Sequence, residues 1–348
     1  MKEFWSARIR DAVPYTPGEQ PRDRKFIKLN TNENPYPPAS GVVEALKNFD
    51  TDKLRLYPEP TCKVLVDAIA DYYGIRSSQV FTGVGSDDVL AMIFMTFFNS
   101  KKPILFPDIT YSFYDVWANM LRIPFETKAL DDYFQIKKED YYGENGGVVF
   151  PNPNAPTGIL MPLSEIEDII AHNRDVIVVV DEAYIDFGGE SALPLIEKYD
   201  NLLVVQTFSK SRSLAGMRLG FAMGNEKLIR YINDVKYSFN SYTLNQTALV
   251  LGVQAIRDRE YFEETCAKVI ATREWTKCEL KKLGFSFGDS MSNFIFATHE
   301  RVPAKEIFEV LREHNIFVRY FSKPRISNYL RISIGTQQEM ERLTAFLA

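Results

Sequence analysis

The sequence predicts an α/β fold with a mostly parallel central sheet sandwiched by helices, a smaller α+β domain and an extended N-terminal arm. Short β-branched runs alternate with helical stretches from about residue 62 to residue 222, as in layered α/β proteins. After residue 245 the pattern changes to long helical stretches and separate strands. The 348 residues also exceed the ~250–300 at which one hydrophobic core stops growing. We therefore expect an arm over residues 1–40, a large domain over 41–245 and a small domain over 246–348.

The first 40 residues predict an extended arm. Proline and asparagine are frequent there, and both favour turns over helices. Because such an arm has little core of its own, we expect it to pack on the small domain and on a partner subunit. Its opening residues lack the apolar stretch of a secretory signal, so we expect none.

The large domain begins with a predicted amphipathic helix over residues 62–73, in which Val64, Leu65, Ala68 and Ile69 share one face. Several of the runs that follow are continuously apolar, as in parallel strands buried on both faces. The predicted strands are residues 80–82, 104–106, 148–150, 176–180, 202–206 and 219–222.

The small domain is predicted to start with one long helix over residues 244–283. Charged residues are scattered along this stretch rather than confined to one face. The elements expected after it are residues 293–297, 302–314, 317–320 and 330–334.

The composition is ordinary for a globular protein, with 45% hydrophobic residues, 25% charged residues and a formal net charge of −5. Proteins that bind nucleic acids typically carry a basic surface, so we expect no nucleic-acid partner. No apolar run reaches the ~20 residues of a membrane helix, so we expect no membrane partner and a cytoplasmic location. The three cysteines are too few and too irregular for a disulfide framework and predict reduced thiols.

Polar segments follow four predicted strands, at the sheet edge where open α/β sheets bind ligands. The first is residues 83–88 (Gly-Val-Gly-Ser-Asp-Asp), which open a predicted helix over 89–98. Backbone N–H groups at a helix N-terminus attract anions, so this segment is a candidate phosphate cradle. The alternative is a strand–helix turn capped by Ser86 or Asp87.

The second and third segments carry amides and carboxylates. Residues 151–158, rich in proline and asparagine, form either a rigid loop that presents amides to a ligand or a surface turn. Residues 181–184 (Asp-Glu-Ala-Tyr) follow a buried strand. A carboxylate at Asp181 is costly there unless a cation pairs with it, for example a protonated heteroaromatic nitrogen. The alternative for Asp181 is a helix N-cap.

The fourth segment contains Lys210 between Ser209 and Ser211, with Arg218 a short distance along the chain. A buried lysine near another cation favours the neutral amine, which forms an imine with an aldehyde. The alternative is a solvated loop lysine.

Together the four segments match the needs of the aldehyde cofactor pyridoxal 5′-phosphate (PLP). Lys210 supplies the imine nitrogen and Asp181 a partner for the pyridine nitrogen. A carboxylate at that nitrogen keeps the ring protonated, so that it withdraws electrons from the substrate Cα. Phosphate donors are expected from Ser86, Ser209 and Arg218.

Over nearly its whole length the chain resembles the fold-type-I PLP-dependent aminotransferases. The resemblance rests on residues 181–184, on residues 207–220 around Lys210 and on residues 330–335 around Arg331. Residues 29–35 (Leu-Asn-Thr-Asn-Glu-Asn-Pro) are similar to the branch of that family that acts on histidinol phosphate.

The resemblance implies a role for each candidate residue. Lys210 forms the imine and moves the proton between the substrate Cα and the cofactor carbon. Asp181 pairs with the ring nitrogen, and Tyr184 hydrogen-bonds the phenolic oxygen of PLP. Further cofactor contacts are implied for Gly85, Ser86, Asp87, Tyr111 (stacked on the ring), Ser209, Arg218 and, from the partner subunit of a homodimer with shared active sites, Tyr57.

Two positions depart from the family pattern. Ala155 stands where the family's Asn-Pro-Thr-Gly loop has an asparagine that contacts the phenolic oxygen. Asn152 or Asn154 is expected to replace that amide. Asp88 stands where glutamate is common and is expected to cap the helix that follows.

The resemblance also implies a ping-pong reaction between histidinol phosphate and 2-oxoglutarate, which yields imidazole-acetol phosphate and glutamate in histidine biosynthesis. Arg331 is expected to hold the anionic group of the substrate, because its planar fork binds carboxylate or phosphate. Tyr15 and Arg319 are expected to add donors for a phosphate, and Asn32 to face the imidazole.

Two other functions on the same scaffold remain open: an aromatic amino-acid aminotransferase and a phosphothreonine decarboxylase. A catalytically silent PLP-fold binding protein is the alternative from another class, although it would be expected to have lost Lys210 or Asp181. A metal-dependent or Ser-His-Asp hydrolase is disfavoured, because the three histidines lack ligand spacing and a Gly-x-Ser-x-Gly turn is missing.

Overall fold

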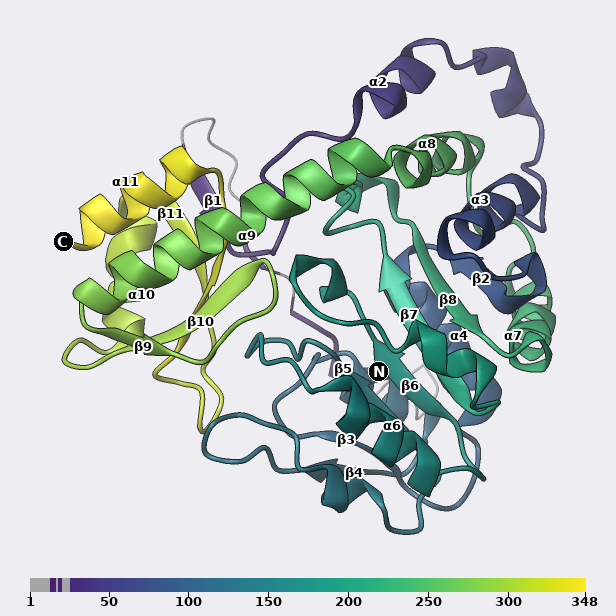
Figure 1. Ribbon diagram of the computed structural model, residues 1–348, viewed down its shortest axis with the longest axis horizontal. Helices are drawn as coiled ribbons and strands as arrows, with labels where there is room; N and C mark the ends of the chain where they lie inside the picture. The colour runs from purple at the N-terminus through teal and green to yellow at the C-terminus, as the bar shows by residue number, and fades with distance from the viewer. Residues whose placement is uncertain (1–12, 17, 21–25) are drawn as a thin grey trace, which may run out of the picture.

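Two β-sheets lie side by side in the computed structural model, and the long helix α9 (Arg259–Lys282) runs past both (Figure 1). The structure describes residues 13–16, 18–20 and 26–348. Residues 1–12, on which the expectation about a signal segment depends, lie outside this part of the chain. In the described part, no helix combines the length and the apolar character that crossing a bilayer requires.

The larger sheet has seven strands in the order β2-β8-β7-β6-β5-β3-β4. Only β8 runs antiparallel to its neighbours, while the other pairings of this sheet are parallel. The predicted α/β class with a mostly parallel sheet is therefore confirmed. The strands are β2 (Val80–Gly83), β3 (Ile104–Pro107), β4 (Phe125–Lys128), β5 (Gly147–Pro151), β6 (Val178–Asp181), β7 (Leu202–Thr207) and β8 (Gly220–Gly224).

Both faces of this sheet are buried by helices. Alternate residues of one strand, such as Val178 and Val179 in β6, belong to two different hydrophobic clusters, because successive side chains point to opposite faces. The edge strand β4 is partly exposed and was not predicted, since it lacks the apolar run of the inner strands. The covering helices are α3 (Lys63–Tyr73), α6 (Leu163–His172) and α8 (Gln246–Arg257) on one face and α4 (Gly85–Phe97), α5 (Tyr114–Leu121) and α7 (Glu226–Phe239) on the other.

The smaller sheet has five strands in the order β1-β11-β12-β10-β9. The strand β1 (Ile27–Leu29) comes from the arm and pairs in parallel with β11 (Ile316–Tyr320), while the other pairings are antiparallel. The arm is followed by α2 (Ser40–Lys47), which leads to the larger sheet. The remaining elements are β9 (Phe285–Phe287), β10 (Phe294–His299), α10 (Ala304–Glu313), β12 (Leu330–Ser333) and α11 (Gln337–Leu347).

The prediction of one helix over residues 244–283 was wrong, because the chain forms α8 and α9 with a break at Asp258. The Asp258 carboxylate accepts a hydrogen bond from the Tyr261 amide at 3.2 Å and so caps the start of α9. Aspartate competes well for such cap positions, which explains the break.

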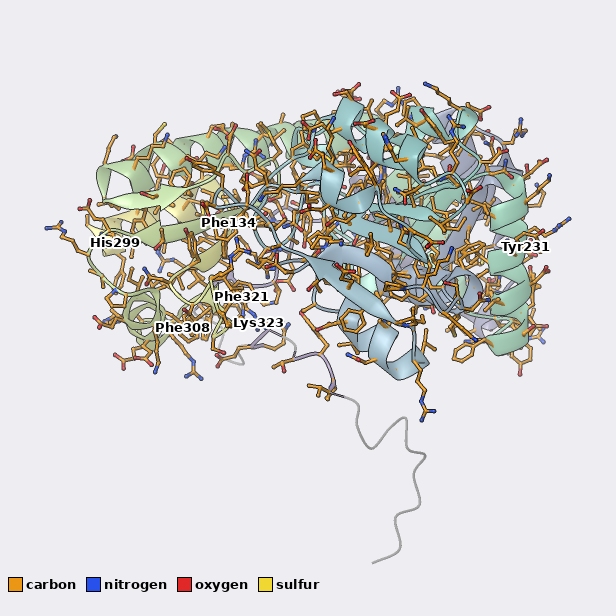
Figure 2. All side chains as sticks on the ribbon, turned by 90° about the horizontal axis from the view of Figure 1, so that it is seen from below. Phe134, Tyr231, His299, Phe308, Phe321 and Lys323 are labelled. Atoms are coloured by element: carbon orange, nitrogen blue, oxygen red, sulfur yellow. The ribbon has the colours of Figure 1, made fainter. Side chains whose placement is uncertain are left out.

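The two sheets are joined by a small aromatic cluster. Phe134 packs edge-on against Phe296 and Tyr329, with ring centroids 5.7 and 5.2 Å apart. Phe134 and Phe321 lie between Tyr231 and His299, which mark opposite ends of the molecule (Figure 2).

Candidate active site

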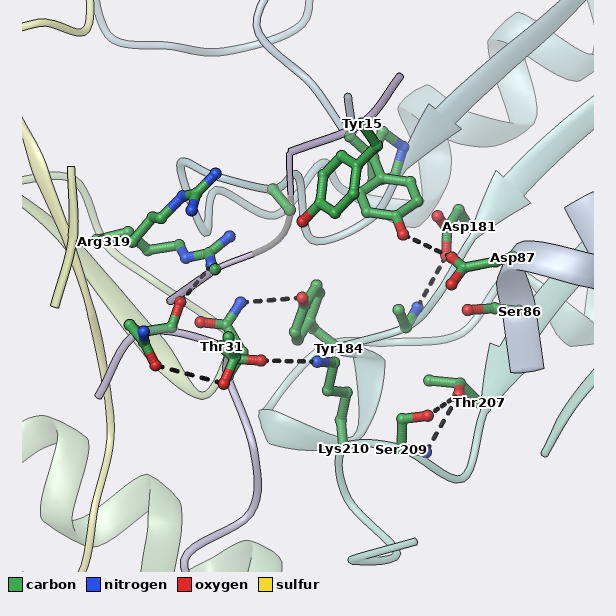
Figure 3. A pocket seen from close by; sticks show the side chains of 18 of the residues that line it. Tyr15, Thr31, Ser86, Asp87, Asp181, Tyr184, Thr207, Ser209, Lys210 and Arg319 are labelled. Carbon is green, nitrogen blue, oxygen red and sulfur yellow. Dashed lines mark hydrogen bonds between the residues drawn. The ribbon is translucent and has the colours of Figure 1, made fainter. Parts of the chain in front are cut away.

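A pocket lies beyond the carboxyl ends of β5, β6 and β7, and the arm together with β11 and β12 forms its other wall (Figure 3). Most of the residues predicted for the site line it: Tyr15, Asn32, Ser86, Asp87, Tyr111, Asp181, Tyr184, Ser209, Lys210, Arg218, Arg319 and Arg331.

One end of the pocket is the start of α4, which follows β2. Gly85 has a φ of +80°, and a Cβ there would lie 2.6 Å from Nη2 of Arg218. The guanidinium of Arg218 therefore packs directly on a backbone that only glycine leaves open. Gly220 of β8 is equally constrained, because its Cβ would lie 2.3 Å from the Ser86 amide.

Arg218 gathers the polar groups at this end of the pocket. Its Nη1 donates to Ser209 Oγ at 3.5 Å and its Nη2 to Asp87 Oδ2 at 3.2 Å. The other oxygen of Asp87 accepts from the Tyr111 hydroxyl at 2.5 Å. The carboxylate of Asp87 thus orients Arg218 and Tyr111, while the serine hydroxyls and the helix N-terminus remain as donors suited to a phosphate.

Asp181 lies deep in the pocket at the end of β6, with 4% of its surface exposed. Burial raises the pKa of its carboxyl to about 6, although hydrogen bonds from the Tyr114 hydroxyl and the Ala183 amide partly offset this effect. These donors lie at 3.0 and 3.2 Å and are both neutral. A protonated ring nitrogen would supply the positive charge that this buried carboxylate lacks, so the site fits PLP.

Lys210 follows β7 and faces the arm. Its Nζ donates to the Thr31 carbonyl at 3.1 Å and lies 5.7 Å from the centre of the Tyr184 ring. The Asn34 side chain donates to the backbone carbonyls of Lys210 and Ser211, at 3.0 and 3.1 Å. The arm therefore holds both the backbone and the amine of the lysine in place.

The opposite end of the pocket is cationic. Arg319 of β11 and Arg331 of β12 are register partners on adjacent strands, and both line the pocket. Burial lowers the pKa of the Arg331 guanidinium, and the charge of Arg319 adds to this effect. Arg331 Nη2 donates to the Asn30 carbonyl at 3.1 Å, while its buried Nε has no hydrogen-bond partner in the described part of the protein. Tyr15 stacks on Phe113 above this end, with ring centroids 4.4 Å apart.

Asn152 and Asn154, expected to supply an amide, are not among the residues that line the pocket. Asn152 exchanges hydrogen bonds with the backbone of Met161, at 2.8 and 3.2 Å. The Asn154 amide donates to the Ile109 carbonyl and to the Thr157 hydroxyl, at 3.0 and 3.1 Å. Both side chains therefore hold the loop in place instead of facing the pocket, and Ala155 is the residue of that loop that lines the pocket beside Pro151.

Tyr57 and Asp88 are the remaining predicted residues. Tyr57 does not line the pocket of its own chain; its ring is 81% exposed and stacks on Tyr242. Asp88 accepts a hydrogen bond from the Val84 amide at 2.9 Å and so caps α4, as expected.

Thr31, Asn34 and Tyr114 contact predicted site residues but were themselves not predicted. Tyr114 had a local signal, because it lies three positions after the predicted Tyr111, at the first residue of α5. The two arm residues had none, since their contacts join distant parts of the chain. Among the described residues, no group of histidine, cysteine, aspartate and glutamate side chains is arranged to hold a metal ion.

Comparisons with known proteins agree with this geometry. Residues 24–347 match the family model of class I and II aminotransferases. A histidinol-phosphate aminotransferase of Clostridium botulinum is 53% identical over 341 residues, which are 98% of this chain and 96% of that protein. One from Pseudomonas putida is 53% identical over 343 residues, 99% of each chain. The crystal structure of histidinol-phosphate aminotransferase from Sinorhizobium meliloti in complex with pyridoxal-5′-phosphate has a TM-score of 0.90 at 22% identity, covering 100% of this chain and 97% of that one.

Proposed function

The chain belongs to the class I and II aminotransferases, and from this premise we propose that it is a PLP-dependent histidinol-phosphate aminotransferase. It transfers the amino group of histidinol phosphate to 2-oxoglutarate, which gives imidazole-acetol phosphate and glutamate. A place in histidine biosynthesis and a cytoplasmic location belong to the same proposal.

The pairing of Arg319 with Arg331 carries the choice of substrate. Two neighbouring guanidinium groups repel each other, and a dianion neutralises both better than a monoanion does. A phosphate monoester offers about two negative charges and three acceptor oxygens at neutral pH. The buried Nε of Arg331, which has no partner among the described residues, gives one of these oxygens a donor, and the Tyr15 hydroxyl is placed to give another.

The residues at the other end suit the cofactor. Ser86, Ser209, Arg218 and the start of α4 bind its phosphate, and the Asp181 carboxylate holds the proton on its ring nitrogen. When bound, PLP supplies a protonated ring that withdraws electrons from the substrate Cα. The Lys210 amine then accepts the proton that leaves Cα and returns it on the cofactor side, as a general base and acid.

We also propose a homodimer that completes the site through Tyr57. Side chains of the segment after α2 and of the end of α7 expose large apolar surfaces, with Leu54 60% and Phe239 70% exposed. Exposed apolar side chains of this kind mark interaction sites, and Tyr57, which is 81% exposed, lies in the same segment as Leu54. A partner copy seated there would receive the Tyr57 hydroxyl at its own phosphate end, beside Ser86 and Arg218.

The test is a visible absorption spectrum of the purified protein during titration with histidinol phosphate, followed by turnover assays with 2-oxoglutarate. Conversion of the cofactor band at low substrate, with kcat/KM for histidinol phosphate well above that for phenylalanine, supports the proposal. A preference for phenylalanine would identify the protein as an aromatic aminotransferase. Release of carbon dioxide from phosphothreonine would identify it as a decarboxylase. If PLP is bound but none of the three substrates changes its absorption band, the protein is a catalytically silent binding protein.

A further inference from the structure

The Asn32 side chain holds the hydroxyl of Tyr184. Its Nδ2 donates to Tyr184 Oη at 3.0 Å, although the two residues belong to distant parts of the chain. Asn32 is 1% exposed and lies on the arm directly after Thr31, whose carbonyl receives Lys210. The tyrosine and the lysine are therefore positioned by consecutive residues of the arm (Figure 3).

The orientation of this amide is fixed by Ser333 of β12. The Ser333 hydroxyl accepts from the Asn32 backbone amide and donates to Asn32 Oδ1, each at 2.9 Å. The Ser333 proton is directed at Oδ1, and in this orientation the Nδ2 group of Asn32 faces Tyr184. Asn293 donates to the Asn32 carbonyl at 2.9 Å, and Asn32 has a φ of 56°, which asparagine tolerates better than most residues.

The hydrogen bond from Asn32 determines where the proton of Tyr184 points. Because Nδ2 occupies one lone pair of the Tyr184 oxygen, the hydroxyl proton is directed away from Asn32 and into the pocket. An amide that faced the tyrosine with its oxygen would do the opposite and take that proton itself. On the far wall Ala155 offers no donor, and the amides of Asn152 and Asn154 are engaged by Met161, Ile109 and Thr157.

We propose that Asn32 is a positioning residue, which orients the Tyr184 hydroxyl so that it donates to the phenolic oxygen of PLP. The inference rests on the proposed function, because it concerns the bound cofactor. Its consequence is electrostatic: a donor at that oxygen stabilises the negative charge that grows there when the imine nitrogen loses its proton. Asn32 thus keeps the pH midpoint of the visible cofactor band low.

The experiment is a spectrophotometric pH titration of the holoenzyme. Asn32→Ala should raise the midpoint by about one pH unit, the effect expected from one hydrogen bond to a charged group. Asn32→Asp should raise it further, because its carboxylate accepts the Tyr184 proton and adds a negative charge. Asn328→Ala, whose amide donates to Thr298 away from the pocket, should leave the midpoint unchanged.

A double-mutant cycle shows whether Asn32 acts through Tyr184. Tyr184→Phe alone should raise the midpoint, and adding Asn32→Ala should then change it by much less than it does in the wild type. An unchanged midpoint in Asn32→Ala, or fully additive shifts in the double variant, would overturn the inference and leave the proposed function standing. A wild-type protein that binds PLP without any cofactor band would overturn both.

Discussion

Arg319 and Arg331 lie directly opposite each other on the adjacent antiparallel strands β11 and β12, and both face one pocket. Two cations so arranged favour an anion with two charges, and the first prediction follows from this pairing.

Arg319→Gln should lower kcat/KM for histidinol phosphate about 10- to 100-fold, the effect of losing a charge-assisted hydrogen bond worth ~1.5–3 kcal/mol. The half-reaction with glutamate should lose less, because one carboxylate at this end can remain on Arg331. Steady-state rates measure kcat/KM for histidinol phosphate, and single-turnover rates measure the half-reaction with glutamate. Arg301→Gln, at an exposed position, is the control. Equal losses for both substrates would argue against a phosphate subsite at Arg319.

Lys210→Ala should abolish the visible band of the imine and lower turnover by at least about 10²–10⁴-fold, the usual contribution of a general acid–base group. Absorption spectra and initial rates measure both effects. Lys281→Ala changes an exposed lysine and should match the wild type. Full activity in the Lys210 variant would contradict the proposed mechanism.

Asp181 should make the cofactor-free protein less stable as pH rises. Burial raises the pKa of its carboxyl from 3.8 to about 6 in the folded state, so the folded protein binds more protons than the unfolded chain between these values. Its contribution to stability is therefore complete below about pH 4 and is lost as pH rises through about 6. Relative to Asp181→Asn, the wild type should lose roughly 1 kcal/mol between pH 5 and 7.5.

Urea unfolding of both cofactor-free proteins at the two pH values measures this difference. The control is Asp132→Asn, at an exposed site. Its free energy of unfolding should change between the two pH values by the same amount as that of the wild type. Addition of PLP should restore the stability at pH 7.5 in the wild type more than in Asp181→Asn. A difference between wild type and variant that does not depend on pH would show that the carboxyl ionises normally.

A mixture of Lys210→Ala and Tyr57→Ala chains should regain activity that neither chain has alone. In the proposed dimer each site uses Lys210 of one chain and Tyr57 of the other, so a mixed dimer contains one intact site. Random exchange of subunits should restore about one quarter of the sites, measured at limiting PLP. The control is a mixture of Lys210→Ala with Asp181→Asn chains. Each site takes Lys210 and Asp181 from the same chain, so both sites of this mixed dimer are defective and no activity should be regained. Recovery in both mixtures, or in neither, would contradict a shared site.

The sequence predicted the cofactor end of the pocket well because its signals are local. Lys210 and Asp181 each follow a strand of a parallel sheet, and the carboxyl ends of such strands meet at one edge. That rule alone brings the two side chains into one pocket, where the structure places them.

The arm side of the pocket was less predictable, because its contacts join residues far apart in the chain. Nothing near Asn32 in the sequence indicates that it would meet Tyr184, and the expectation that it faces the imidazole stays a prediction. At the loop around Ala155 the sequence suggested too much. Its composition indicated amides free to bind a ligand, but Asn152 and Asn154 hold the loop in place. Composition does not reveal whether an amide is already engaged.

The pairing of β1 with β11 has a consequence for the order in which the protein is made. The arm is synthesised before the larger sheet, and its partner strand β11 is synthesised after it, so β1 has no partner strand while the larger sheet is made. During that time all the strands of the larger sheet can form, while Thr31 and Asn34 have no fixed position against Lys210. A nascent chain with a complete larger sheet would therefore still lack a finished cofactor pocket, and PLP capture is expected to wait until β11 and β12 have been made.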